Sequence, residues 1–359
     1  MKVLVAMSGG VDSSVAAALL KEAGHDVVGV TLRLWGGESD SGCCSVSDVD
    51  DARRVAQQLG IDHLVFNYSD DFQRTVVDPY VSDHAEGITP NPCIECNRHL
   101  KFDRLFERAE VLGFDAVATG HHARVECIDG VWRLLRGHDA AKDQSYVVHV
   151  LDQRRLSRCL FPVGAMNKSE VRDHAARLGL RTAAKPDSQD VCFITSSGGR
   201  TDFLRRRIEL HPAEVVDESG EAIGRVDAVE LVTLGQRRGV AGGGGVKRFV
   251  VDVDVPGRRV TVGTESTLLV ENEFAVAPVW TNGVVEGDVL VQCSAHGEPR
   301  RGNLRRVIDQ SSSQSTVVVD WERPERRVSP GQSLVFYEPT HGWVIGGATV
   351  TARPENSTR

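Results

Sequence analysis

The sequence predicts an α/β protein, with an N-terminal doubly wound parallel sheet followed by two small β-barrel domains. Strand-like apolar runs alternate with amphipathic helical segments over the first ~200 of the 359 residues. From about residue 210 the pattern changes to short alternating strands separated by Gly and Pro, with no long helix. We therefore expect an α/β domain over residues 1–207, a central small β domain over 208–277, a C-terminal β-barrel over 278–353 and a frayed tail over 354–359.

The chain begins with a strand, a glycine-rich turn and a helix. The apolar run 3–6 precedes Ser8-Gly9-Gly10-Val11-Asp12-Ser13-Ser14, and a helical pattern covers 15–23. Glycines let backbone N–H groups approach a phosphate, and the start of a helix favours negative charge. No Gly-Lys-Ser/Thr closes the loop, so it is not a Walker A loop. The pattern indicates a nucleotide site, and the alternative is an ordinary Gly-Ser turn.

The other elements of the α/β domain follow from periodicity and from helix start and stop signals. We expect strands at 27–32, 63–66 and 115–120, and helices at 48–59, 100–112 and 169–178, the last one capped by Asn167. Ligands of such sheets bind at the carboxyl ends of the strands. The loop 8–14, Leu32 and Gly120 should therefore lie together.

The C-terminal strands are expected at 248–255, 259–262, 288–291, 316–319 and 333–336. A break between the two β domains is expected near 278–287.

Composition indicates a soluble globular protein in the cytosol. Hydrophobic residues make up 41% and charged residues 26%. No apolar run approaches the ~20 residues that span a bilayer, and the first strand is too short for a signal peptide. In the cytosol the eight cysteines point to metal binding, thiol chemistry or plain burial rather than disulfide scaffolding.

The net charge of −8 does not indicate a nucleic-acid binder, so such a partner would need local patches. Candidate patches are Arg205-Arg206-Arg207, Arg237-Arg238, Lys247-Arg248, Arg300-Arg301 and Arg305-Arg306.

Two motifs carry cysteines in surroundings that favour a reactive thiol. In Thr89-Pro90-Asn91-Pro92-Cys93-Ile94-Glu95-Cys96-Asn97 a helix begins soon after the prolines, and a helix start stabilises a thiolate. In Asp187-Ser188-Gln189-Asp190-Val191-Cys192-Phe193 one cysteine lies in a polar segment. Half of a zinc site and a redox pair are the alternatives for Cys93-x-x-Cys96.

Seven motifs in order resemble those of the bacterial tRNA-specific 2-thiouridylases, which belong to the N-type ATP pyrophosphatases with an adenine nucleotide α-hydrolase-like fold. The motifs are those at 8–14, 89–97 and 187–193 together with Ala-Thr-Gly-His at 118–121, Lys-Asp-Gln-Ser-Tyr at 142–146, Phe-Pro-Val-Gly at 161–164 and Thr-Leu-Gly-Gln-Arg-Arg-Gly at 233–239. Pro330-Gly331-Gln332-Ser333 is a further family-like stretch.

The resemblance implies an enzyme that uses ATP to adenylate the C2 oxygen of the wobble uridine in the anticodon arm of tRNA. Sulfur from a cysteine persulfide then replaces that oxygen. It implies Mg²⁺ on the pyrophosphate and a sulfur donor protein, either a cysteine desulfurase or a persulfide relay. It implies no membrane partner, and no residue is expected to serve as a protein ligand to a metal.

The resemblance also assigns residues. Ala6, Met7, Ser8, Gly9, Gly10, Val11, Asp12, Ser13, Leu32 and Gly120 match nucleotide-binding positions. Cys96 matches the nucleophile and Cys192 the persulfide-bearing cysteine. Contacts with the target base fall on Asn91, Pro92 and Cys93, and contacts with tRNA on Lys142, Asp143, Gln144, His296 and Gly297.

One position departs from the family, because some relatives carry an aspartate with an acid/base role where this chain has Cys93. Cys93 could titrate in that role, a water or Asp190 could replace it, or the reaction needs no such group. The Gly242–Gly245 run either orders around RNA or is a plain linker.

Two rival functions remain at this stage. A small-molecule ligase would keep the nucleotide loop and need no paired thiols. A zinc-stabilised RNA-binding protein would use the Cys-x-x-Cys pair and the barrels without ATP turnover.

Overall fold

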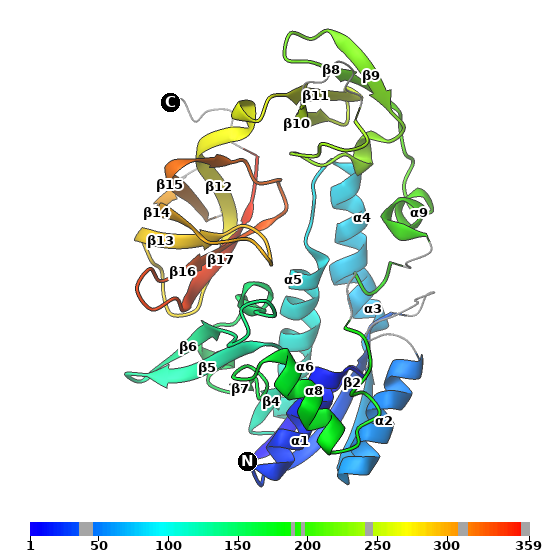
Figure 1. The fold of residues 1–359 in the computed structure, drawn as a ribbon, viewed down its shortest axis with the longest axis vertical. Helices are drawn as coiled ribbons and strands as arrows, with labels where there is room; N and C mark the ends of the chain where they lie inside the picture. The colour runs from blue at the N-terminus through cyan, green and yellow to red at the C-terminus, as the bar shows by residue number, and fades with distance from the viewer. Residues whose placement is uncertain (36–45, 188–190, 195–197, 241–246, 308–314, 353–359) are drawn as a thin grey trace.

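A computed structural model describes residues 1–35, 46–187, 191–194, 198–240, 247–307 and 315–352. The parallel sheet lies at the end that carries the N-terminus, the small central sheet lies at the opposite end, and the barrel lies between them on one side (Figure 1). Two long helical segments connect these levels. No helix in the described ranges is both long and apolar enough to cross a bilayer.

The N-terminal sheet is five-stranded and parallel, in the order β3-β2-β1-β4-β7. Its strands are β1 (Lys2–Ala6), β2 (Asp26–Arg33), β3 (Asp62–Asn67), β4 (Ala116–Ala118) and β7 (Cys159–Leu160). Apolar side chains of β1 alternate, so that Val3 and Val5 face one core cluster and Leu4 faces the other. The first cluster is covered by α1 (Val11–Glu22), α2 (Val46–Leu59) and α8 (Lys168–Arg177). The predicted doubly wound sheet is confirmed.

Two continuous helical segments carry π-helical stretches in their middle. The first joins α3 (Ser69–Phe72), η1 (Gln73–Val77) and α4 (Asp78–Ala85), and it was not predicted. The second joins α5 (Pro92–Cys96), η2 (Asn97–Arg104) and α6 (Leu105–Val111). The predicted helix at 100–112 is therefore only the later part of a helix that begins at Pro92. It begins there because the Asn91 side chain accepts a hydrogen bond from the Ile94 N–H at 3.3 Å.

The C-terminal unit is a closed antiparallel barrel. Its strands are β12 (Leu269–Trp280), β13 (Gly287–Gln292), β14 (Arg300–Val307), β15 (Thr316–Arg326), β16 (Ser333–Tyr337) and β17 (Val344–Val350). They pair in the order β12-β15-β14-β13-β16-β17, and a β12–β17 pairing closes the ring. β12 includes residues on both sides of the boundary expected between residues 277 and 278.

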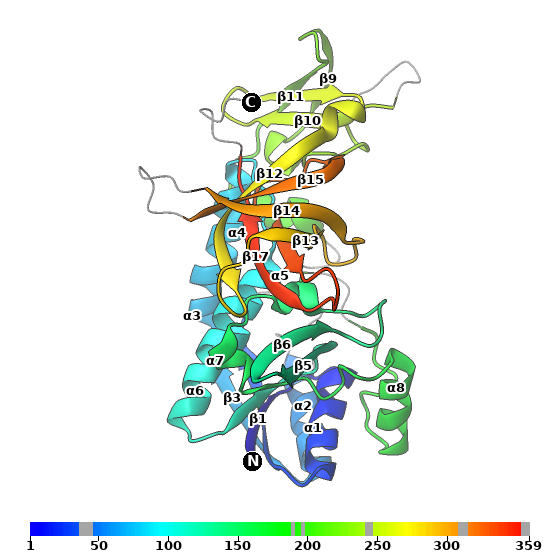
Figure 2. The same cartoon turned by 90° about the vertical axis from the view of Figure 1, so that its left-hand side faces the viewer.

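A hairpin of the N-terminal domain extends this barrel sheet. It consists of β5 (Ala123–Ile128) and β6 (Val131–Arg136), and Leu134 of β6 pairs with Val344 of β17. Figure 2 shows the hairpin between the parallel sheet and the barrel. It was not predicted, because its position depends on this distant partner.

The central unit is a four-stranded sheet in the order β10-β11-β8-β9. Its strands are β8 (Ala213–Val216), β9 (Ala222–Val226), β10 (Phe249–Asp254) and β11 (Arg259–Gly263), around a small valine-rich core. Its edge strands β9 and β10 do not pair with each other within the described residues. The remaining short helices are η3 (Ser145–Val148), α7 (Gln153–Leu156), α9 (Gly199–Arg205), η4 (Val229–Leu231) and η5 (Ser266–Leu268).

A barrel loop holds the chain just before α5. The Thr89 N–H donates to the Pro330 carbonyl at 2.9 Å, and the Gln332 side-chain amide donates to the Thr89 carbonyl at 2.6 Å. Gly331 has φ +89°, and an added Cβ would lie 2.5 Å from Ile88 Cγ2. Only glycine permits this close approach, so the barrel fixes the entry to the cysteine-bearing helix.

We expect Gly331→Ala to destabilise the protein more than Gly342→Ala. Both glycines lie in the barrel with positive φ, which costs a substituted alanine about 1–2 kcal/mol. Nothing lies within 4 Å of an added Cβ at Gly342, whereas at Gly331 the Cβ meets Ile88, which adds about 1–3 kcal/mol. Urea unfolding of the two variants measures the difference, and equal losses would contradict the close approach.

Candidate active site

The glycine-rich loop lies where β1, α1, α2 and the end of β4 meet. Gly9 has φ +75°, and an added Cβ would lie 2.3 Å from the Asp48 carbonyl oxygen of α2. A Cβ on Gly120 would lie 2.5 Å from the Ser13 nitrogen. Both positions require glycine because another backbone occupies the space. The structure thus brings Gly120 against the first turn of α1, whose free N–H groups are suited to an anion.

The loop is tied internally and to β2. The Ser8 N–H donates to Ser13 Oγ at 3.1 Å, and the Ser13 and Ser14 hydroxyls donate to the Gly10 carbonyl at 3.2 and 2.8 Å. The Thr31 hydroxyl donates to the Met7 carbonyl at 2.8 Å. The loop is therefore held in one shape by its own residues.

Two lysines flank the loop, and the sequence analysis missed both. Lys168 Nζ lies 2.7 Å from each Asp12 carboxylate oxygen. Lys185 Nζ donates to the Gly9 carbonyl at 3.0 Å and pairs with Asp48 at 2.5 Å. Both ammonium groups reach the loop from distant segments, whereas a Walker A lysine belongs to the loop itself. Each also pairs with a second carboxylate, Asp187 for Lys168 and Asp51 for Lys185.

A ring of polar contacts, closed through the backbone between residues 142 and 144, connects this loop with two other predicted segments. From Asp12 it runs through Lys168 to Asp187 at 2.9 Å, and from Asp187 to Lys142 at 2.8 Å. From Asp12 it also runs to His122 Nε2 at 3.1 Å, and the His122 N–H donates to the Gln144 side-chain oxygen at 2.9 Å. Residues 142 and 144 belong to one expected tRNA-contact segment, and Asp187 is the first residue of the Cys192 motif. These contacts therefore join the tRNA-contact segment both to the glycine-rich loop and to the Cys192 motif.

Both carboxylates of this ring stay ionised at neutral pH. Burial tends to raise the pKa of Asp12, but hydrogen bonds from His122 and Lys168 hold that pKa below its ordinary value. For Asp187 burial is likewise outweighed by Lys142 and Lys168, and the pKa falls to about 2. Arg172 adds a further cation to Asp187 at 2.8 Å. The positive charge of Lys168 therefore offsets the repulsion that Asp12 would exert on a phosphate.

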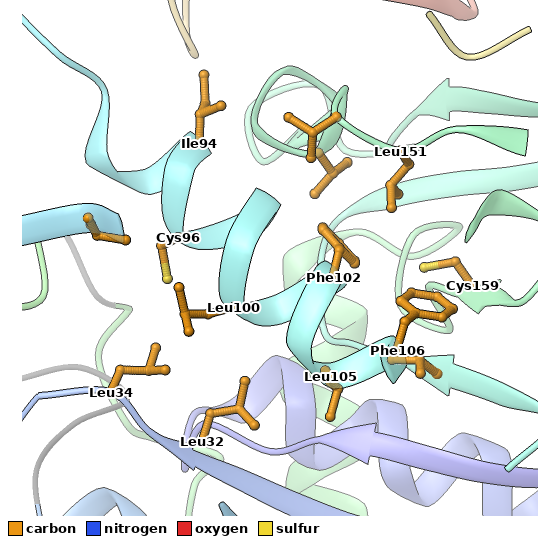
Figure 3. Packing of buried hydrophobic residues seen from close by; sticks show 14 of the residues in the cluster. Leu32, Leu34, Ile94, Cys96, Leu100, Phe102, Leu105, Phe106, Leu151 and Cys159 are labelled. Atoms are coloured by element: carbon orange, nitrogen blue, oxygen red, sulfur yellow. The ribbon is translucent and has the colours of Figure 1, made fainter. Parts of the chain in front are cut away.

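Cys96 and Cys192 pack in the same apolar cluster, although they are distant in sequence. Cys96 ends α5 and is only 6% exposed, and Cys192 is half-buried against the cluster. Figure 3 shows the Cys96 side chain directed toward Leu100 and toward Leu34, which lies just past the end of β2. Leu32, an expected nucleotide contact, belongs to the cluster as well. The structure therefore brings both predicted thiols to the carboxyl end of the sheet.

An aromatic group anchors the segment that carries Cys192. The ring of Phe193 lies between four others, with centroid distances of 6.0 Å to Trp35, 5.6 Å to Phe72, 5.4 Å to Tyr80 and 5.2 Å to Phe203. Phe193 is only 2% exposed. No sequence pattern predicts this group, because its members are scattered along the chain without a common period.

The residues expected to contact the target base surround the start of α5. Asn91 is the cap, Pro92 is the first helical residue, and Cys93 is exposed. Asn91 also lines a cavity of about 350 Å³ between the helical segments and the barrel. His99 lines this cavity too, and hydrogen bonds with Asp103 and Glu95 raise its pKa to about 9.

The two cysteines of the Cys-x-x-Cys pair differ in exposure, since Cys93 is open to solvent and Cys96 is buried. In the described part of the chain no three His, Cys, Asp or Glu side chains gather as a metal site.

Other expected tRNA contacts lie apart from the loop or face inward. His296 and Gly297 lie in the barrel between β13 and β14. Asp143 is engaged within the protein, because it accepts hydrogen bonds from Arg136, the Gly137 N–H and Ser145. Cys43, Cys44, Asp190 and the Gly242–Gly245 run lie outside the described residues.

The barrel arginines suggested as RNA-binding patches are each matched by a carboxylate. Arg300 pairs with Glu325, Arg301 with Glu322, Arg305 with Asp320 and Arg306 with Glu286, at distances of 2.6 to 4.0 Å. The barrel face that carries them is therefore close to neutral.

Comparisons with known proteins agree on one family. The family model described as tRNA methyl transferase HUP domain matches residues 1–196, and the one described as aminomethyltransferase beta-barrel domain matches residues 275–350. A tRNA-specific 2-thiouridylase MnmA from Chloroflexus aurantiacus is 46% identical over 363 residues, covering 98% of this chain and 99% of the relative. A protein of the same name from Cutibacterium acnes is 45% identical, covering 98% and 96%.

Among solved structures, the U34-tRNA thiolase NcsA from Methanococcus maripaludis is similar at 21% identity and a TM-score of 0.36. The match covers 53% of this chain and 61% of that one.

We expect Asp187→Asn to destabilise the protein by about 2 kcal/mol at pH 7, and by about half as much at pH 3. The pKa of Asp187 is lowered from 3.8 to about 2 by folding, so its stabilisation is present above about pH 4 and is lost as the pH falls toward 2. Urea unfolding at both pH values measures the change. Asp320→Asn, which removes an exposed ion pair, should cost less than about 1 kcal/mol. An equal cost of Asp187→Asn at both pH values would contradict this charge arrangement.

Proposed function

Because the chain belongs to the family of tRNA-specific 2-thiouridylases, we propose that it converts the wobble uridine of tRNA to 2-thiouridine, with ATP cleaved to AMP and pyrophosphate. The observation that carries this proposal is that both thiols lie near the segment that follows β2. The Cys96 side chain is directed toward Leu34, and Phe193, the neighbour of Cys192, lies 6.0 Å from Trp35 between ring centroids. The glycine-rich loop lies at the same edge of the sheet, at the end of the adjacent strand β1. A nucleotide and two thiols can then act on one base.

The first step activates the base. ATP binds with its phosphates on the Gly9–Ser13 loop, and the C2 oxygen of uridine attacks the α-phosphate. The bond to pyrophosphate breaks and an O-adenylated uridine forms. Lys168 and Lys185 stabilise the negative charge, since both ammonium groups already lie against the loop. Carbonyl oxygen is a poor leaving group, and bound AMP makes it a good one.

Mg²⁺ suits this step because it neutralises charge on a departing pyrophosphate. Mg²⁺ keeps several waters and binds to phosphates and to one or two carboxylates rather than to an all-protein cage. Asp12 is the carboxylate at the loop that fits this requirement, and its oxygens now contact Lys168.

The second step delivers sulfur. A donor protein, a cysteine desulfurase or a persulfide relay, leaves a persulfide on Cys192. In one route Cys96 attacks the inner sulfur of that persulfide and releases sulfide, which adds at C2 and expels AMP. In the other route the terminal persulfide sulfur attacks C2 and expels AMP. Cys96 then attacks the Cys192 sulfur, so that the S–S bond of the persulfide breaks and its outer sulfur stays on C2. Both routes oxidise the two cysteines to a Cys96–Cys192 disulfide, which an external thiol must reduce before the next turnover, as is possible in the cytosol.

The apolar surroundings of the thiols favour this chemistry. A site that excludes water prevents loss of the adenylated base and of the persulfide by hydrolysis. The aromatic group around Phe193 supplies such a wall next to Cys192.

The target base must leave the anticodon stack to reach these thiols. Asn91, Pro92 and Cys93 form the start of α5, one turn away from Cys96, and we assign them to contacts with the extruded base. Lys142, Gln144, His296 and Gly297 are assigned to contacts elsewhere on tRNA. Asp143 positions that segment through Arg136 and Ser145.

The test is mass spectrometry of tRNA after incubation with the protein, ATP and a sulfide source. We expect 2-thiouridine and AMP that depend on both ATP and tRNA. AMP formed without tRNA would contradict the proposal and favour a metabolite ligase.

Cys96→Ser and Cys192→Ser should abolish thiolation with a persulfide donor and leave ATP binding unchanged, because both thiols belong to the apolar cluster, whereas the phosphates are expected on the glycine-rich loop. Cys127→Ser is the matched control, since Cys127 is exposed on the β5–β6 hairpin. Full activity of Cys192→Ser would overturn the mechanism.

A further inference from the structure

Four exposed arginines gather on one segment beside the thiol cluster. Arg200 and Arg205 lie on α9, and Arg206 and Arg207 follow directly. We call these four residues the 200–207 arginine cluster. Its concentration of positive charge stands out in a chain whose net charge is −8.

Most of this charge has no carboxylate partner. Arg206 pairs with Asp202 at 2.8 Å, but among the described residues Arg200 donates only to the Leu231 carbonyl, and Arg207 stacks over the Phe203 ring at 3.8 Å. In the part of the chain that the structure describes, Arg205 has no ion-pair or hydrogen-bond partner. The barrel arginines, by contrast, are each paired across strands. Unpaired arginines on an acidic protein indicate a surface suited to an anion.

The cluster borders the place that the target base must reach. Arg207 stacks on Phe203, and the ring of Phe203 lies 5.2 Å from that of Phe193, the neighbour of Cys192. Arg200 and Arg205 share α9 with Phe203, and the Phe203 ring also lies 6.2 Å from that of Tyr80. The arginines therefore lie around the same aromatic group that adjoins Cys192.

We propose that the 200–207 arginine cluster binds backbone phosphates next to the target uridine and so holds the extruded nucleotide over the thiols. This inference rests on the proposed function. Guanidinium groups bind phosphate oxygens through paired N–H donors. An extruded base requires its flanking backbone to be held, and Arg205 and Arg207 have charge free for that contact. An acidic region of a sulfur donor protein is the other anion that such a surface could take.

The experiment measures the affinity of Arg205→Ala/Arg207→Ala for an unmodified tRNA transcript at several salt concentrations. We expect binding to weaken about tenfold or more and the slope of log K against log salt to fall by about 2, since two phosphate contacts are lost. ATP affinity should not change. Arg305→Ala/Arg306→Ala is the matched control, and its slope should remain that of the wild type.

Two further variants separate charge from folding. Arg205→Ala alone should lower the slope by about 1, because it removes one exposed cation. Arg205→Lys/Arg207→Lys should restore most of the slope, because it keeps both charges. An unchanged slope in the double alanine variant would overturn the inference. If that variant with an unchanged slope also lost sulfur transfer from the donor protein, but kept thiolation with free sulfide, the surface would bind the sulfur donor and not tRNA. Failure of the proposed function would show separately, as a wild-type protein that forms no 2-thiouridine.

Discussion

The ion chain from Asp12 through Lys168 to Asp187 is the interaction on which the geometry of the site depends. Asp12 opens α1, Lys168 opens α8, and Asp187 begins the segment that leads to Cys192. Lys168 is largely buried, and a buried charge that loses its partner costs several kcal/mol. None of the three groups can therefore move alone. The glycine-rich loop and the start of the segment that leads to Cys192 are held by the same three side chains.

The barrel contributes to the site although it lies far from the glycine-rich loop. Its loop at 330–332 makes two hydrogen bonds with Thr89, and its strand β17 pairs with the β5–β6 hairpin of the N-terminal domain. Through Thr89 it fixes where α5 begins, and α5 carries Cys93 and Cys96. Residues near the C-terminus thus determine the placement of a helix near residue 92. This arrangement explains why Pro330-Gly331-Gln332 is a motif although it carries no reactive group.

The sequence predicted the elements that depend on residues close together in the chain. The strand, glycine turn and helix at the N-terminus follow from backbone sterics and helix-end charge, and the parallel sheet follows from alternating periods. The parts it missed depend on partners distant in the chain. Lys168 is 156 residues from Asp12, and no spacing rule connects them. The β5–β6 hairpin is stabilised by β17, and the aromatic group around Phe193 forms only when four separate segments fold together.

The different exposure of Cys93 and Cys96 follows from the helix that carries both. Asn91 caps α5 at its first turn, so Cys93 lies at the open end, where a base can approach from solvent. Cys96 lies one turn further and faces the apolar cluster, where the proposed sulfur chemistry would be shielded from water. A structural zinc site requires both thiolates on one ion, with two more ligands around it. A pair divided between solvent and core is better suited to two separate tasks, one at the base and one at sulfur.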